Sequence, residues 1–167
     1  HLLFKDKVIK NALVICPASL KYQWKSEIEK FTSYTSIVVD GSLVKRKRIY
    51  EDSSNYHFTI VNHETVRNDL ELLQNLKFGL IILDEAHKIK NRQAKTAKAI
   101  YKLNAPFKIG LTGTPMQNRP EELYSLFKWI DPTVLGKVAD FTKRYIVTGN
   151  KFGRRFVTIG YRNLGEL

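Results

Sequence analysis

A continuous run of apolar residues that ends in two acids constrains the fold more than any other stretch of this sequence. Residues 80–83 read Leu-Ile-Ile-Leu, and Asp84 and Glu85 follow them directly. Four consecutive large apolar residues are typical of a strand buried on both faces, as in a parallel sheet between helices. Ligands of such sheets bind at the carboxyl ends of the strands. We therefore expect the two acids to lie at a ligand site.

The rest of the chain alternates between strand-like and helix-like segments. Further strands are predicted at residues 12–16, 36–39, 57–61 and 107–111, and helices at residues 19–31, 42–50, 65–76, 91–103 and 120–131. Ser19 is the predicted N-cap of the first of these helices. Such regular alternation predicts an α/β fold with a parallel sheet and helices on both faces. Beyond residue 140 we expect a short helix near residues 141–145 and a hairpin or loop over residues 148–160.

The length and the charge of the chain indicate how many domains it holds and what kind of partner it binds. The chain has 167 residues with one cysteine, Cys16, and 28 Lys and Arg residues against 16 Asp and Glu residues, a formal charge of +12. We expect one partial domain over residues 1–167, with residues 137–167 as a peripheral insertion and the start of the next helix. The excess of positive charge favours a polyanionic partner, nucleic acid first. Because no apolar stretch is long enough to cross a bilayer, we expect no membrane partner and an intracellular protein, cytoplasmic in a prokaryote and nuclear in a eukaryote.

The acid pair suggests a specific chemistry. Successive strand residues point to opposite faces, so Asp84 can hold Mg²⁺ while Glu85 orients or deprotonates a water molecule. This is the chemistry of nucleoside triphosphate hydrolysis; the alternative is a strand that ends in a solvated acidic turn. A second predicted strand ends in Leu-Thr-Gly-Thr-Pro at residues 111–115, one helix later. Both ends open on one edge of a parallel sheet, where the hydroxyl groups could bond to His87 and sense a phosphate.

Several short motifs, in one order along the chain, resemble those of a known family. Residues 84–87 (Asp-Glu-Ala-His) resemble the DEAH form of motif II in superfamily-two helicases, and residues 111–118 resemble motif III of the SWI/SNF-related ATPases. Residues 13–31 and 60–64 resemble that branch's motif Ia and the motif after it, except that His63 stands where an aromatic Tyr is expected. The resemblance implies a RecA-like lobe, the first of two, in a DNA-dependent ATPase.

The resemblance also assigns roles to individual residues. It implies that Asp84 binds Mg²⁺ and that Glu85 activates the attacking water, with ATP as the nucleotide. Coupling of the nucleotide state to the nucleic acid would fall to His87, Thr112, Gly113, Thr114 and Gln117. Contacts to double-stranded DNA would come from Pro17, Ala18, Ser19, Lys21 and Asn62. A second RecA-like lobe of the same protein would complete the ATP site, and the oligomeric state is left open.

The departures from the family pattern keep other interpretations open. The chain contains no G-x-x-x-x-G-K-[ST] sequence, the P-loop that should precede motif Ia. We therefore expect an internal piece of a larger translocase, cut at both ends and inactive by itself. A DEAH-type RNA helicase lobe and a non-catalytic basic nucleic-acid-binding module are the alternatives. Trp24 is expected in the core, and Lys45 to Arg48 are expected either as a solvated helix face or as a DNA contact.

Overall fold

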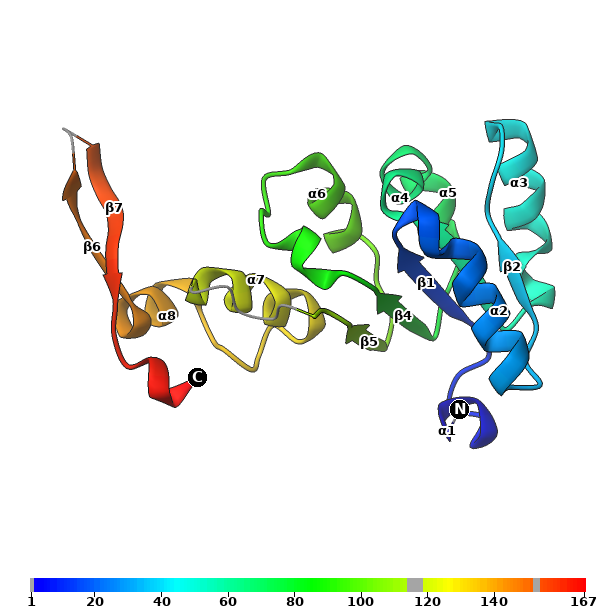
Figure 1. Cartoon of the computed structure of the whole chain (residues 1–167), viewed down its shortest axis with the longest axis horizontal. Coiled ribbons are helices and arrows are strands. Elements are labelled where there is room, and N and C mark those ends of the chain that lie inside the picture. Colours follow the sequence, from blue (N-terminus) through cyan, green and yellow to red (C-terminus); the bar gives the residue numbers. More distant parts are fainter. Residues whose placement is uncertain (1, 114–118, 152–153) are drawn as a thin grey trace.

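A five-stranded parallel sheet forms the centre of the protein. The computed structural model describes residues 2–113, 119–151 and 154–167. The strands lie in the spatial order β2-β3-β1-β4-β5 (Figure 1). Their bounds are β1 Ala12–Cys16, β2 Ser36–Val38, β3 Phe58–Asn62, β4 Leu80–Leu83 and β5 Phe107–Gly110. The predicted parallel α/β fold is confirmed, and each predicted strand is present to within one residue at either end.

Helices cover both faces of this sheet, but in unequal number. One face carries α3 Leu43–Asp52, α4 His63–Asn68, α5 Leu70–Asn75, α6 Lys95–Tyr101 and α7 Pro120–Ile130. The other face carries α1 Leu2–Lys5 and α2 Lys21–Phe31. Short 3-10 turns, η1 Ala18–Leu20, η2 Ser53–Asn55 and η3 Ala86–Ile89, connect these elements. The sheet is thus the middle layer of a three-layer arrangement.

The side chains of β1 alternate between two hydrophobic clusters. Leu13 and Ile15 belong to the cluster under α3 to α7, whereas Val14 and Cys16 belong to the cluster under α2. Every residue of β1 is fully buried. This explains why the strand is continuously apolar: polar alternation would place a polar side chain in one core or the other.

Two details of the predicted helices are wrong. Ser19 does not cap a helix, because it lies inside the turn η1, and neither η1 nor α2 has a side-chain cap. The single helix predicted over residues 65–76 is two helices, which meet at Asp69. The first begins at His63 because the side chain of Asn62 accepts a hydrogen bond from the Thr65 amide.

The segment from Val138 to Leu167 extends away from the sheet. Helix α8 Val138–Tyr145 leads into a two-stranded antiparallel hairpin, β6 Ile146–Lys151 and β7 Arg154–Tyr161, followed by the turn η4 Leu164–Glu166. In Figure 1 this hairpin stands beyond α7 and α8, at the opposite end of the molecule from β2. A small aromatic cluster of Tyr124, Phe141 and Tyr145 joins α8 to α7. None of the helices in the described ranges is long and apolar enough to cross a membrane.

Candidate nucleotide and nucleic-acid site

The parallel register brings four strand ends together at one edge of the sheet. Ile15 of β1 pairs with Leu83 of β4, and Leu83 pairs with Gly110 of β5. On the other side of β1, Cys16 pairs with Asn62 of β3. The segments that follow these strands contain the candidate site residues predicted from the sequence. The meeting of the ends of β4 and β5 at one edge was predicted, and the register confirms it.

Asp84 is the first residue beyond β4, and hydrogen bonds hold it on several sides. Its amide donates to the Ile15 carbonyl at 2.8 Å, which continues the ladder to β1. One carboxylate oxygen, Oδ1, accepts the Glu85 amide at 2.9 Å, and the other, Oδ2, accepts the indole N–H of Trp24 at 3.0 Å. The acid is half-buried, and its orientation is fixed by α2 as well as by its own turn. No pattern in the sequence indicates the Trp24 contact, which joins residues 60 positions apart.

Glu85 adopts a left-handed backbone conformation, with φ 52° and ψ 49°. A residue other than glycine rarely takes this conformation, which costs of the order of 1 to 3 kcal/mol and is concentrated at functional sites. The Glu85 carboxylate lies 3.0 Å from Nδ1 of His87, and both side chains remain more than one-third exposed. This is an ion-pair distance and not a hydrogen bond, because Nδ1 has no hydrogen-bond partner among the described residues. The Glu85 side chain is 40% exposed at the sheet edge, so a water molecule could reach its carboxylate.

The end of β5 is tied to the acid turn through the backbone. The Ala86 amide donates to the Leu111 carbonyl at 2.8 Å, and the Leu111 amide donates to the Leu83 carbonyl at 2.8 Å. Thr112 and Gly113 follow directly. A displacement of the turn after β4 would therefore displace the turn after β5. Coupling of the acid pair to Thr112 and Gly113 requires such a connection. The two remaining predicted coupling residues, Thr114 and Gln117, lie outside the described residues.

The predicted nucleic-acid contacts after β1 divide into two groups. Ala18 and Ser19 are exposed in the turn η1, and Pro17 is partly exposed. Backbone amides at the start of such a turn lack partners within it and can receive a phosphate. Lys21, by contrast, is buried: its ammonium donates to the Val39 carbonyl at 3.1 Å and lies 3.2 Å from the Asp40 carboxylate. We therefore correct the prediction for Lys21, whose charge is used to fix α2 to the end of β2.

Asn62 and His63 also have structural partners. The Asn62 side chain caps α4 through the Thr65 amide at 2.8 Å, so one of its oxygen lone pairs is occupied. His63 is buried, and its Nε2 lies 3.1 Å from the backbone carbonyl oxygen of Asp84. Burial, assisted by the positive charge of Lys88, lowers the pKa of His63, so the ring is neutral near pH 7. His63, which stands where the motif resemblance predicted a Tyr, thus supports the backbone of the acid turn.

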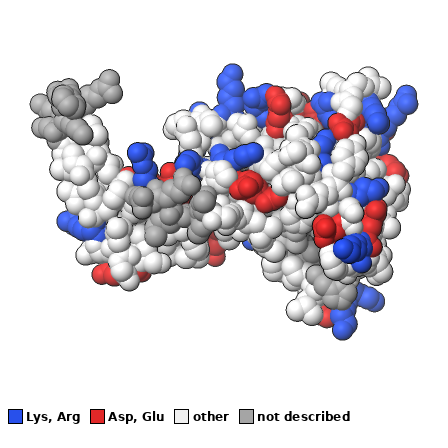
Figure 2. Space-filling view, in the orientation of Figure 1, with Lys and Arg blue, Asp and Glu red and all other residues white. Residues whose placement is uncertain are grey.

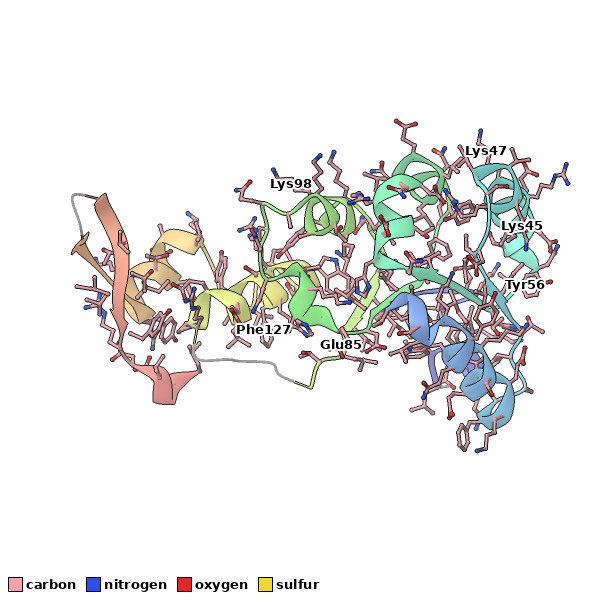
Figure 3. The ribbon with its side chains drawn as sticks, turned by 45° about the horizontal axis from the view of Figure 1, so that its top comes forward. Lys45, Lys47, Tyr56, Glu85, Lys98 and Phe127 are labelled. Atoms are coloured by element: carbon pink, nitrogen blue, oxygen red, sulfur yellow. The ribbon has the colours of Figure 1, made fainter. Side chains whose placement is uncertain are left out.

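The basic side chains lie mainly elsewhere. Figure 2 shows Lys and Arg side chains gathered along the upper edge of the view, over α6 and α3. Figure 3 shows Lys98 pointing outward from α6 and Lys47 from α3, whereas Glu85 lies at the turn after β4. Within the predicted basic run, Arg46 does not face solvent, because it forms an ion pair with Asp69 at 2.6 Å. Lys45, Lys47 and Arg48 remain exposed, and their role as a solvated face or a DNA contact stays open.

The donor set fits Mg²⁺ better than a structural metal. No group of three or more His, Cys, Asp or Glu side chains in the described ranges could hold a metal ion. Mg²⁺ is commonly held by one or two carboxylates, with waters and substrate phosphates as the remaining ligands. Each of the two Asp84 carboxylate oxygens accepts a hydrogen bond and keeps a further lone pair for a cation or its water shell. Asp84 is therefore the residue suited to that role.

The fold and this edge together define a class of protein. A parallel sheet with an acid pair after a buried interior strand, and with further strand ends around that pair, is the arrangement of a RecA-like lobe. The chain belongs to the family of the SNF2-related domain, which matches residues 2–157. The family resemblance drawn from the motifs is thus confirmed.

Individual relatives agree with this assignment. The chain is 37% identical over 137 residues to TATA-binding protein-associated factor 172 of Homo sapiens, covering 80% of this chain and 7% of that protein. It is 35% identical over 140 residues to DNA repair and recombination protein RAD54B of Gallus gallus, covering 83% and 15%. A solved structure, the Sulfolobus solfataricus SWI2/SNF2 ATPase core in complex with dsDNA, is similar with a TM-score of 0.75 and 29% identity, over 86% of this chain and 30% of that one. The chain thus spans a small part of its relatives.

Proposed function

We propose that this chain is the first RecA-like lobe of an ATP-driven motor that moves along double-stranded DNA. The observation that carries the proposal is the meeting of the acid pair, the exposed turn after β1 and the end of β5 at one sheet edge, in a chain of the SNF2-related family. The similarity to an ATPase core in complex with dsDNA supports the choice of substrate. The small share of each relative that the chain covers supports the view that it acts within a longer protein.

In this proposal each group of residues at the carboxyl-terminal edge of the sheet has a separate role in the motor. Asp84 would hold Mg²⁺ against the nucleotide phosphates, and Glu85, partly exposed at this edge, would orient the attacking water. The backbone amides near Ala18 and Ser19 would receive a DNA phosphate. The hydrogen bond between Ala86 and Leu111 would carry a change at the acids to the end of β5. A second lobe would close on this edge and open again with each ATP, and the intact protein would work in the cytoplasm of a prokaryote or the nucleus of a eukaryote.

The test is ATP hydrolysis by the intact protein, measured alone and with duplex DNA, single-stranded DNA and duplex RNA. We expect stimulation mainly by duplex DNA. Stimulation mainly by RNA would favour the RNA-helicase alternative, and no turnover with any of them would favour a binding module. DNA affinity should also fall steeply with salt, with a log-log slope of about −0.9 per phosphate contacted.

A substitution tests the role of Glu85. Glu85→Gln keeps the shape of the side chain and removes its basicity, so we expect turnover to fall roughly 100-fold or more while ATP and DNA binding stay near wild type. The matched control is Glu71→Gln, which changes an exposed acid of α5 far from the site and should leave turnover unchanged. Persistent hydrolysis by Glu85→Gln would contradict the assignment.

A further inference from the structure

One side chain on α2 contacts the acid that the proposed function assigns to Mg²⁺. The indole N–H of Trp24 donates to Asp84 Oδ2 at 3.0 Å. Trp24 is half-buried and packs against the cluster under α2, so its ring is held from behind. Its position in the apolar stripe of the helix accounts for the packing but not for the polar contact.

The contact fixes the Asp84 carboxylate without competing for the metal. The Glu85 amide holds Oδ1 and Trp24 holds Oδ2, so the plane of the carboxylate is set at both ends. An indole nitrogen is a donor only, so it cannot itself ligate a cation. Hydrogen-bond partners of metal ligands commonly change metal affinity by 10-fold to 100-fold when they are removed.

The surroundings leave room for a ligand and link it to the turn after β1. A cavity of about 210 Å³ opens beside the contact and is lined by Leu20, Gln23, Trp24, Glu27 and Asp84. Helix α2 begins directly after η1, the turn that contains Ala18 and Ser19. A displacement of that turn would move Trp24 with the helix, and the hydrogen bond would pass the displacement to Asp84.

We propose that Trp24 is a positioning residue: its indole N–H orients Asp84 for Mg²⁺ and links the exposed turn after β1 to the metal ligand. This inference rests on the proposed function, because it takes Asp84 as the ligand. Trp24→Phe keeps an aromatic ring in the stripe and removes the donor. In the intact protein we expect it to raise the Mg²⁺ concentration needed for half-maximal ATP hydrolysis about tenfold, with little change in the rate at saturating Mg²⁺.

The chain supplies a matched control. Trp129 is its second tryptophan, and the Trp129 indole N–H has no hydrogen-bond partner among the described residues. Trp129→Phe therefore removes an equivalent group that orients nothing, and the Mg²⁺ requirement should not change. An equal shift in both variants, or no shift in Trp24→Phe, would overturn the proposal.

A second measurement does not depend on hydrolysis. The 167-residue chain has two indole N–H groups, whose NMR signals are assigned with the two Trp→Phe variants. Mn²⁺, a paramagnetic substitute for Mg²⁺ at oxygen ligands, should broaden the Trp24 signal well before that of Trp129, and excess Mg²⁺ should restore it. Asp84→Asn should abolish the selective broadening. Equal broadening of both signals would refute the inference. Selective broadening in this chain, together with an intact protein that hydrolyses no ATP, would refute the proposed function and leave Trp24 assigned.

Discussion

The two faces of the β-sheet are covered to different extents. Five helices pack on one face, and its side chains, such as Ile81 at 1% exposure, are buried along β1, β3 and β4. The other face carries α1 and α2, whose side chains pack against β1, β2 and β3. The side chains of β5 and of the residue after it are more open there, with exposures of 39%, 42% and 40% at Phe107, Ile109 and Leu111. The register places Ile109 beside Ile82 and therefore on the α2 side of the sheet.

The two faces therefore differ in role: one contributes stability through its buried core, and the other exposes apolar side chains on β5. The face under α3 to α7 has a contiguous core and should supply most of the stability of the chain. The uncovered strip lies on the edge strand, next to the strand that carries Asp84. A chain segment that covered this strip would also lie beside the acid pair. An apolar edge strand left open is moreover a site at which copies of a protein can aggregate.

The largest expected effect is the loss of a buried ion pair on the five-helix side. Asp69 accepts hydrogen bonds from Arg46 at 2.6 and 2.7 Å and from the Tyr50 hydroxyl at 3.0 Å, and its side chain is fully buried. Asp69→Asn would leave the Arg46 charge uncompensated between α3 and the junction of α4 and α5. We expect a loss of about 3 to 5 kcal/mol in the free energy of unfolding, measured with urea.

The neighbouring charge offers the control for this prediction. Arg48 lies in the same helix but is exposed, so Arg48→Ala should change the free energy of unfolding by less than about 0.5 kcal/mol. A cost below about 1 kcal/mol for Asp69→Asn would mean that α3 is held by its apolar contacts alone.

The next effect compares the two faces directly. Ile81→Ala on the five-helix side should cost about 2 to 5 kcal/mol, because it removes buried methyl groups and leaves a cavity. Ile109→Ala on the open strip should cost less than about 1 kcal/mol and should reduce aggregation in light scattering. A similar loss in the free energy of unfolding for the two variants would show that β5 is as well packed as β4. The two faces would then not differ as described.

The fold could be predicted well from the sequence because the governing signals are local. Short, largely apolar segments identified the strands, with continuous apolar runs in β1 and β4, and the order of strands and helices identified the parallel sheet. The meeting of the strand ends follows from that topology alone. The order of the elements was therefore sufficient to place residues 17–19, 84–87 and 111–113 at one edge.

The partners of individual polar side chains could not be predicted in this way. Asp69, at which a predicted helix is broken, is held by Arg46, 23 positions away. The ammonium of Lys21 is bound by Asp40, and the indole of Trp24 by Asp84, each from a different element. These contacts depend on how the elements pack. The capping of α4 by Asn62 differs, because an Asn three residues before the amide it accepts is a local signal that could have been used.

The smallest expected signal tests whether the α2 side is sealed over β1. Cys16 is fully buried there, and burial, with the nearby charge of Asp84, raises the pKa of its thiol to about 12. At a pH of about 8 a thiol-specific reagent such as DTNB should therefore label the native chain hardly at all, because the thiolate is the reactive form. Labelling should follow unfolding, and rapid labelling of the native protein would show that α2 opens readily.

The same pKa predicts how stability depends on pH. The unfolded thiol loses its proton near a pH of about 8.5, whereas the folded thiol keeps it to about pH 12, so the folded state binds more protons between these values. The contribution of Cys16 to stability is therefore complete below about pH 8.5 and is lost as the pH rises towards about 12. Cys16→Ala removes this group, so the decline in urea midpoint between about pH 8 and about pH 10 should be shallower in the variant than in the wild type. Parallel declines in the two proteins would mean that the thiol is not protected by the α2 side of the sheet.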